Sequence, residues 1–303
     1  MLKTILKWVG IVVGALVVVI VCLGVWFYAK SNRAIARTFT IDQPALTIPT
    51  DSASIQRGRH IATAMSSCID CHAEHLGGQM VIDQAPFMRL GAPNLTRGAG
   101  GVGATLTDAD FVRAIRHGVG PDGRALALMP SEAYQHFSDA DLGAVIAYVK
   151  SVAPVDNPVP PREFGPIARM LLARGQFPLF HTGEIDHAAA RSVTAPADTT
   201  SADYGHYMAN IAGCTSCHGP GLSGGAIPGA PPEAPPAPNI TPSGIGTWTE
   251  ADFFRALREG KGSGGRQLNA FMPYRYFKDL SDGEIRALWA FVHSVPSKEY
   301  GHR

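Results

Sequence analysis

The sequence contains little charge and no excess of either sign. Charged residues make up 17% of the 303 positions, with 26 Lys and Arg against 25 Asp and Glu. Proteins that bind nucleic acid usually carry a basic excess, and disordered chains combine high net charge with few apolar residues. The composition therefore excludes a disordered chain and gives no reason to expect a nucleic-acid partner. With 46% hydrophobic residues, the length suits about two globular domains.

Cysteine is also scarce, which excludes a framework of disulfides. Four of the five cysteines fall in two short patterns, Cys68-Ile-Asp-Cys71-His72 and Cys214-Thr-Ser-Cys217-His218. C-x-x-C-H is the attachment pattern of c-type haem, in which both thiols bond to the porphyrin and the histidine binds iron. A thioredoxin-like pair does not need the histidine, and a zinc site would have to join cysteines about 146 positions apart. We predict two covalently bound haem c groups, with His72 and His218 as iron ligands.

The segments around the two patterns repeat each other. Five pairs of matching segments lie about 145 residues apart: 58–62 and 205–209, 93–96 and 238–241, 106–111 and 248–253, 128–130 and 271–273, 137–142 and 280–285. Such a repeat predicts two copies of one domain. We place domain 1 at residues 50–153 and domain 2 at residues 204–298, joined by a proline-rich linker with an apolar segment at 154–203.

Alternation of apolar and polar residues, the signature of β-strands, is rare in the sequence. Helix signals are common instead, in the form Ser or Thr followed three residues later by an acid: Thr107/Asp110, Ser138/Asp141, Thr249/Asp252 and Ser281/Glu284. Gly118 and Gly260 are placed to end the helices that begin at residues 107 and 249. We therefore predict mostly α-helical domains.

The N-terminal segment has no charged residue from Trp8 to Ala29. As a helix, these 22 residues would be about 33 Å long, which matches the apolar thickness of a bilayer. A cleaved signal peptide has a shorter apolar run and a small-residue cleavage site, so we predict an uncleaved anchor at residues 1–30. Cationic residues flank both ends, so charge alone does not orient it.

Each haem iron needs a second axial ligand. Met129 and Met272 occupy the same place in both copies, each before a proline, and methionine is a ligand that raises the potential of c-type haem. Several histidines could serve instead, but none recurs at matching positions. His117 aligns with Glu259, and we expect its side chain on the surface. His60 and His206, on the helix before each attachment pattern, are expected to face the solvent.

Other side chains are expected to contact the porphyrins. Arg124 and Arg266 each precede the predicted methionine ligand by five or six residues. Since guanidinium groups pair well with carboxylates, these two arginines are candidates for contact with the haem propionates. Met65 and Met208 lie just before the attachment patterns and are expected to pack against the porphyrin edge.

At these residues the chain resembles the class I c-type cytochromes, in the form of a membrane-anchored dihaem cytochrome. It is most similar to the cytochrome subunits of bacterial periplasmic alcohol and gluconate dehydrogenases, on segments 158–161, 238–241, 244–253 and 271–273. Those subunits carry three haem domains, and this chain has two attachment patterns.

The resemblance implies a carrier of electrons rather than an enzyme. The donor would be a periplasmic dehydrogenase, and the acceptor a quinone, a soluble cytochrome or a terminal oxidase. Haem c is attached outside the cytoplasm, so the anchor would cross the inner membrane once, with both haem domains in the periplasm. The alternative is a dihaem redox enzyme of the peroxidase or thiosulfate-dehydrogenase type, in which one haem has an open or unusual distal ligand.

Overall fold

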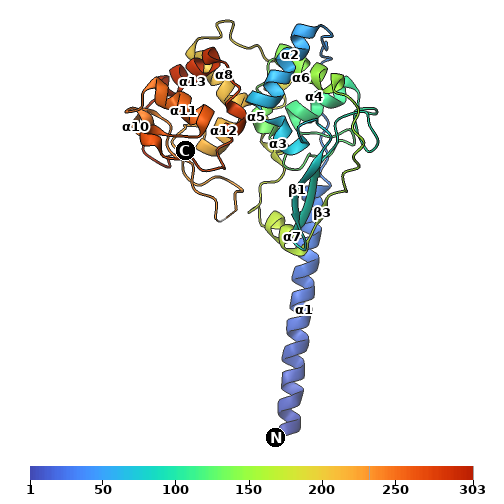
Figure 1. The fold of residues 1–303 in the computed structure, drawn as a ribbon. Helices are drawn as coiled ribbons and strands as arrows, with labels where there is room; N and C mark the ends of the chain where they lie inside the picture. Colours follow the sequence, from blue (N-terminus) through green and yellow to red (C-terminus); the bar gives the residue numbers. More distant parts are fainter. Residues whose placement is uncertain (232, 303) are drawn as a thin grey trace.

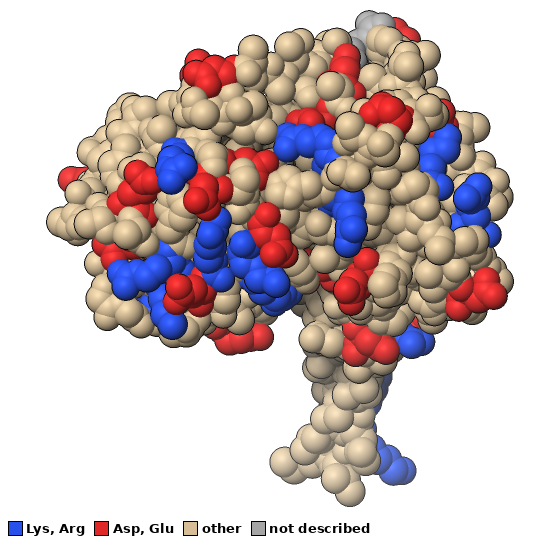
Figure 2. All heavy atoms as spheres, turned by 45° about the horizontal axis from the view of Figure 1, so that its top comes forward, with Lys and Arg blue, Asp and Glu red and all other residues tan. Residues whose placement is uncertain are grey.

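The computed structural model describes residues 1–231 and 233–302, and consists of a globular head on a long helical stalk (Figure 1). The stalk is helix α1 (Leu2–Ile35), whose apolar side chains are exposed from Leu2 to Trp26. In the described part of the chain it is the one helix long and apolar enough to cross a membrane. Figure 2 shows charges of both signs spread over the head, whereas most of the stalk is uncharged. The predicted N-terminal apolar helix is confirmed.

The head contains the two copies of one helical domain, side by side (Figure 1). In domain 1 the helices are α2 (Ser52–His60), the π-helical turn η1 (Ile61–Met65), α3 (Cys68–His72), α4 (Asp108–His117), α5 (Ser131–Tyr134) and α6 (Asp139–Ser151). In domain 2 they are α8 (Ala202–Ile211), α9 (Cys214–His218), α10 (Pro242–Ile245), α11 (Glu250–Glu259), the 3-10 turn η4 (Ser263–Gly265), α12 (Tyr274–Phe277) and α13 (Asp282–Ser294). The mostly α-helical prediction is confirmed.

The predicted helix boundaries follow from local hydrogen bonds. Complete capping boxes form at the N-termini of α4, α11 and α13. At α6, Ser138 accepts from the backbone N–H of Asp141, but the Asp141 carboxylate turns away from the cap and contacts domain 2. Gly118 and Gly260 end α4 and α11 in the left-handed region, at φ 65° and 68°.

In each domain the first and last long helices cross closely at a glycine. A Cβ atom on Gly58 of α2 would lie 1.9 Å from the carbonyl oxygen of Ala144 on α6. A Cβ atom on Gly205 of α8 would lie 2.0 Å from the carbonyl oxygen of Ala287 on α13. Both distances are far shorter than any van der Waals contact, so the crossing requires glycine at these two positions.

Domain 1 also contains a small antiparallel sheet that we did not predict. Strand β1 (Gln79–Gln84) pairs with β2 (Met88–Ala92), and β2 pairs with β3 (Glu163–Phe164). The strands are too short for a clear alternation of apolar and polar residues. In addition, β3 comes from the linker, so its pairing depends on a contact that is remote in sequence.

The linker folds back over domain 1 instead of extending between the domains. It contains β3, helix α7 (Pro166–Ala173) and the 3-10 turns η2 (His181–Glu184) and η3 (Ala189–Arg191). Asn157 donates hydrogen bonds to the carbonyls of Gly77 and Gly78. A separate small core, formed by Met88 and Leu90 of β2 with linker residues, joins the sheet to α7. The domain boundaries at 153 and 204 stay a prediction.

The expectation that His117 lies on the surface is wrong. Its side chain is completely buried, with Nε2 2.7 Å from the Gln43 side-chain oxygen and Nδ1 3.0 Å from Nδ1 of His187. Gln43 belongs to the segment after the anchor, and His187 belongs to the linker. The comparison with Glu259 failed because neither covering segment has an equivalent around domain 2.

The two domains pack against each other through equivalent surfaces. Tyr207 of α8 donates to the carboxylate of Asp141 on α6 at 2.7 Å. The equivalent residues of the other copies, His60 of α2 and Glu284 of α13, form the matching contact at 2.8 Å. Because the same contact occurs in both directions, the domains are related by an approximate two-fold axis. His60 is therefore half-buried in the interface, contrary to expectation, whereas His206 is exposed.

Arg57 of α2 connects the two acidic residues of this interface. Its Nε atom lies 3.0 Å from Asp141 and its Nη1 atom 3.3 Å from Glu284. Its Nη2 atom also donates to the hydroxyl of Tyr204, the equivalent residue in domain 2, at 2.9 Å. The side chains of both acids are only about a tenth exposed, so the guanidinium compensates two carboxylates held out of water, one from each domain.

Candidate haem sites

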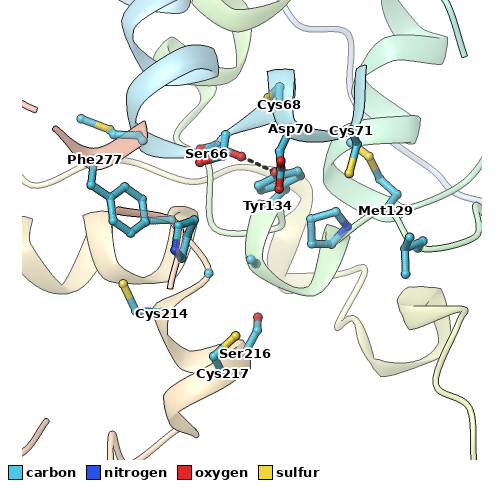
Figure 3. A pocket seen from close by; sticks show the side chains of 18 of the residues that line it. Ser66, Cys68, Asp70, Cys71, Met129, Tyr134, Cys214, Ser216, Cys217 and Phe277 are labelled. Atoms are coloured by element: carbon cyan, nitrogen blue, oxygen red, sulfur yellow. Dashed lines mark hydrogen bonds between the residues drawn. The ribbon is translucent and has the colours of Figure 1, made fainter. Parts of the chain in front are cut away.

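Both C-x-x-C-H segments line one cavity of about 1150 Å³ in the head. Figure 3 shows Cys68 and Cys71 on one side of this cavity and Cys214 and Cys217 on the other, with Ser66 and Tyr134 between them. Most of the lining is apolar, with residues from both domains. Burial raises the pKa of the Cys68 and Cys214 thiols to about 12, as expected for groups removed from water.

The histidine of each pattern is held in the orientation that an iron ligand needs. Nδ1 of His72 donates to the backbone carbonyl of Pro93 at 2.9 Å, and Nδ1 of His218 donates to that of Pro238 at 2.8 Å. A proton fixed on Nδ1 leaves the lone pair on Nε2, the usual arrangement for a metal-binding histidine. Burial lowers the pKa of His72 and outweighs the opposite effect of the Pro93 hydrogen bond.

A turn held by an asparagine side chain positions each proline carbonyl. The side-chain oxygen of Asn94 accepts hydrogen bonds from the backbone N–H and the hydroxyl of Thr96, at 2.9 and 2.8 Å. Asn239 and Thr241 form the same pair of bonds at 2.8 and 2.7 Å. The sequence showed this Pro-Asn-x-Thr segment as a repeat, but its role was missed because the segment lies about 20 residues after the histidine that it orients.

Both predicted methionine ligands line the cavity. Met129 and Met272 are half-buried, and each precedes a proline that leads into a short helix, α5 or α12. Met65 and Met208 are fully buried and also line the cavity.

The structure separates the two arginines that we proposed for the propionates. Arg266 lines the cavity, whereas Arg124 is exposed beside Asp122 and is not part of the lining. Arg162, from the linker, lines the cavity in domain 1. Burial lowers the pKa of Arg162, which is consistent with its half-buried position. No sequence pattern marks Arg162, because only the folding of the linker brings it to the cavity.

Hydrogen bonds and an ion pair near the attachment helices join the two domains. Tyr134 donates to the carbonyl of Ser66 at 2.6 Å, and the Ser66 hydroxyl donates to the carbonyl of Ile211 in domain 2 at 2.9 Å. Asp70, within the first C-x-x-C pattern, forms an ion pair with Arg275 of α12 at 2.7 Å. Ser216, within the second pattern, donates to Glu132 of α5 at 3.2 Å. Each attachment helix therefore contacts the opposite domain.

Comparison with known proteins agrees with this geometry. A family model described as cytochrome c oxidase, cbb3-type, subunit III matches residues 53–149 and again residues 202–292. The chain belongs to this cytochrome c family. The two matches contain the two attachment patterns, so this cytochrome binds haem c at two sites. The thiols, the oriented imidazoles and the apolar cavity fit that cofactor.

Curated relatives of this cytochrome are subunits of dehydrogenases. It is 30% identical over 271 residues to the fructose dehydrogenase cytochrome subunit of Gluconobacter japonicus, which covers 81% of this chain and 53% of the relative. Over 107 residues it is 38% identical to the cytochrome c subunit of the alcohol dehydrogenase (quinone) of Gluconobacter oxydans. That match covers 33% of this chain and 22% of the relative. Over 99 residues it is 35% identical to the gluconate 2-dehydrogenase cytochrome c subunit of Pantoea cypripedii. That match covers 30% of this chain and 22% of the relative. The chain spans about half the length of the first relative and less than a quarter of the other two.

Proposed function

We propose that this cytochrome is the electron-carrying subunit of a membrane-bound dehydrogenase complex. The observation that carries this proposal is an apolar cavity, shared by the two domains, that both attachment helices line. Haem iron, when bound, supplies a one-electron centre in each domain. The chain holds the two attachment helices together through the Ser66, Asp70 and Ser216 contacts and keeps most of the cavity lining apolar.

The axial ligands that we propose are His72 with Met129, and His218 with Met272. The duplicated Met-Pro segments at the cavity and the fixed histidine tautomers support this assignment. Two protein ligands on each iron would leave no open position for peroxide or oxygen, as a carrier requires. For the propionates we propose Arg266 in domain 2 and Arg162, in place of Arg124, in domain 1.

The proposed donor is a periplasmic dehydrogenase subunit, as the names of the relatives suggest. The proposed acceptor is a quinone, a soluble cytochrome or a terminal oxidase. Helix α1 supports a single crossing of the inner membrane, with the N-terminus in the cytoplasm and both haem domains in the periplasm. Such an anchor would keep the carrier beside membrane-bound acceptors.

Carbon monoxide binding separates a carrier from an enzyme. The full chain, purified in detergent with its haem attached, should contain two haems by the pyridine haemochrome assay. The reduced protein should bind carbon monoxide at neither haem. Met129→Ala and Met272→Ala should each open one haem, whereas Met208→Leu, at a buried cavity residue beside the attachment helix, should open none. Rapid binding by the unaltered protein would contradict the carrier proposal and favour the enzyme.

The donor can be tested by reconstitution. The chain should be co-expressed with the catalytic subunit of a dehydrogenase of the fructose, alcohol or gluconate type that the relatives name. The substrate of that dehydrogenase should then reduce both haems within the turnover time of the enzyme. Omission of the catalytic subunit is the control. If the dehydrogenase reduces an artificial acceptor while both haems stay oxidised, the proposed partner is wrong.

A further inference from the structure

Helix α7 lies against the end of the stalk, at the base of the head (Figure 1). It contacts α1 where the charge-free run ends and where the exposed aromatic residues Trp26 and Tyr28 are found. Exposed aromatic side chains at the end of an apolar helix mark the boundary between the apolar part of a bilayer and water. If α1 spans a membrane, α7 is therefore at the level of the lipid headgroups.

One side chain fixes α7 to the stalk. Arg169 is the only polar residue of α7, and its guanidinium lies 4.5 Å from the centre of the Tyr28 ring. Its Nη1 atom also lies 3.2 Å from the Ser31 hydroxyl and 3.4 Å from the Asn32 side-chain oxygen. A surface helix normally directs such a charge to water, but here the Arg169 guanidinium contacts α1 instead.

One side of α7 is buried against the head, and the other side is partly exposed. Ala168 and Ala173 are buried, and Ala168 packs in the small core beneath the sheet. Ile167 is 52% exposed, and Met170 and Leu171 are half-buried. Positions 167, 170 and 171 share one helix face, so α7 presents an apolar stripe outward. The exposed cations Lys30, Arg33 and Arg174 lie on α1 and just beyond the end of α7.

We propose that α7 is an interfacial helix whose Ile167–Leu171 stripe inserts into the outer surface of the lipid bilayer that α1 crosses. An apolar stripe held at headgroup level next to cationic side chains is the arrangement of helices that lie in a membrane surface. With α1 this makes two contacts with the membrane, so the head cannot swivel freely on its stalk. Domain 1 is then fixed over the membrane, because β3 joins α7 directly to the sheet.

The inference rests on the proposed membrane insertion of α1, and the test measures both. The full chain with haem, carrying Cys22→Ala, receives a single cysteine in place of Val17, Ile167 or Tyr300, all more than half exposed. Each of the three variants is labelled at this cysteine with the fluorophore NBD and inserted into vesicles of phosphatidylcholine and phosphatidylglycerol. Aqueous iodide and lipids with a quencher at a shallow or a deep acyl position then report the depth of each label. Haem content and the optical spectrum verify that each variant is folded.

The label at position 167 should be quenched most by the shallow lipid quencher, and roughly threefold less by iodide than the label at position 300. The label at position 17 should respond to the deep quencher, which tests the anchor by itself. If position 17 is in lipid and position 167 is as open to iodide as position 300, the α7 proposal is wrong and the anchor stands. If position 167 is shielded from both quenchers, a protein surface covers the stripe, and the proposal is also wrong. If position 17 is in water, the anchor itself fails.

Discussion

At the scale of single residues, two asparagines hold the turns that orient His72 and His218, the proposed iron ligands. Asn94 is fully buried, and its amide nitrogen also donates to the Val155 carbonyl at 2.6 Å. Asn239 forms the equivalent bond to Lys298 at 2.8 Å, in a half-buried setting. The two asparagines therefore make the same hydrogen bonds with different access to water.

Asn94→Ala should destabilise domain 1 by about 2–4 kcal/mol, since the substitution leaves buried hydrogen-bonding groups of the turn without partners. Asn239→Ala is the matched variant, and should cost domain 2 about half as much because water can replace the lost bonds. Unfolding followed by the circular dichroism of the haem band measures both. Equal losses would show that burial does not determine the cost.

The buried His117, in contact with the half-buried His187, should make domain 1 sensitive to acid. Burial, then the neighbouring His187 and Arg116, lower the pKa of His117 from 6.5 to about 4. The unfolded chain therefore takes up a proton between pH 6.5 and 4 while the folded protein does not, so stability is lost as the pH falls through that range. The loss that His117 causes is at most about 3.5 kcal/mol.

Comparison of variants isolates this effect. His117→Gln should show a shallower fall in the free energy of unfolding between pH 6.5 and 4 than the unaltered protein. His75→Gln, at an exposed position, is the control and should keep the steep fall of the unaltered protein. If the His117→Gln profile is as steep as that of the unaltered protein, other groups cause the acid sensitivity.

At the scale of secondary-structure elements, the crossings of α2 with α6 and of α8 with α13 depend on glycine. Both crossings bring a helix backbone against a carbonyl group of its partner, at Ala144 and Ala287. These helix pairs frame the two haem domains, so a change in their separation would also change the cavity.

Gly58→Ala should destabilise domain 1 by about 3 kcal/mol or more, because its new methyl group would overlap a backbone atom that cannot rotate away. Gly283→Ala is the control, since its Cβ would meet nothing closer than 4.0 Å and its φ is not in the left-handed region. Urea unfolding should show Gly283→Ala as neutral or slightly stabilising. A neutral Gly58→Ala would mean that the helices separate at little cost.

At the scale of the whole molecule, the polar interface couples the two domains. Glu284 accepts hydrogen bonds from Arg57 and His60 of domain 1 and from the backbone N–H of Ser281 in its own helix. Burial opposes its ionisation, but these hydrogen bonds prevail and hold its pKa below 4.5. Its stabilising contribution is therefore present above pH 4.5 and is lost as the pH falls through the lowered value.

Glu284→Gln should weaken this coupling by about 1–3 kcal/mol at neutral pH, since Arg57 and His60 lose a mostly buried negative partner. We expect the midpoint of thermal unfolding to fall and the two domains to unfold in separate steps. Glu250→Gln is the matched control, because its ion pair with Arg286 is exposed and is worth little. A single unfolding step at the original midpoint in Glu284→Gln would show that the apolar contacts alone join the domains.

The sequence by itself determined the chemistry of this protein, because haem attachment is a local property. Five consecutive residues supply the two thiols and the imidazole, and a charge-free run of sufficient length predicts the anchor helix. The helix caps were equally readable, since each depends on neighbours within a few positions. The repeated Met-Pro segments marked two residues that line the cavity, and their role as iron ligands stays a prediction.

Only the tertiary structure decided which side chains are buried and which domain contacts which element. His117 is covered by Gln43 and His187, segments without an equivalent in domain 2, so its alignment with Glu259 misled. Arg162 lines the cavity and Arg124 does not, because the linker folds back over domain 1. Both outcomes depend on contacts between residues that are distant in sequence, and burial is a property of those contacts rather than of the residue or its neighbours.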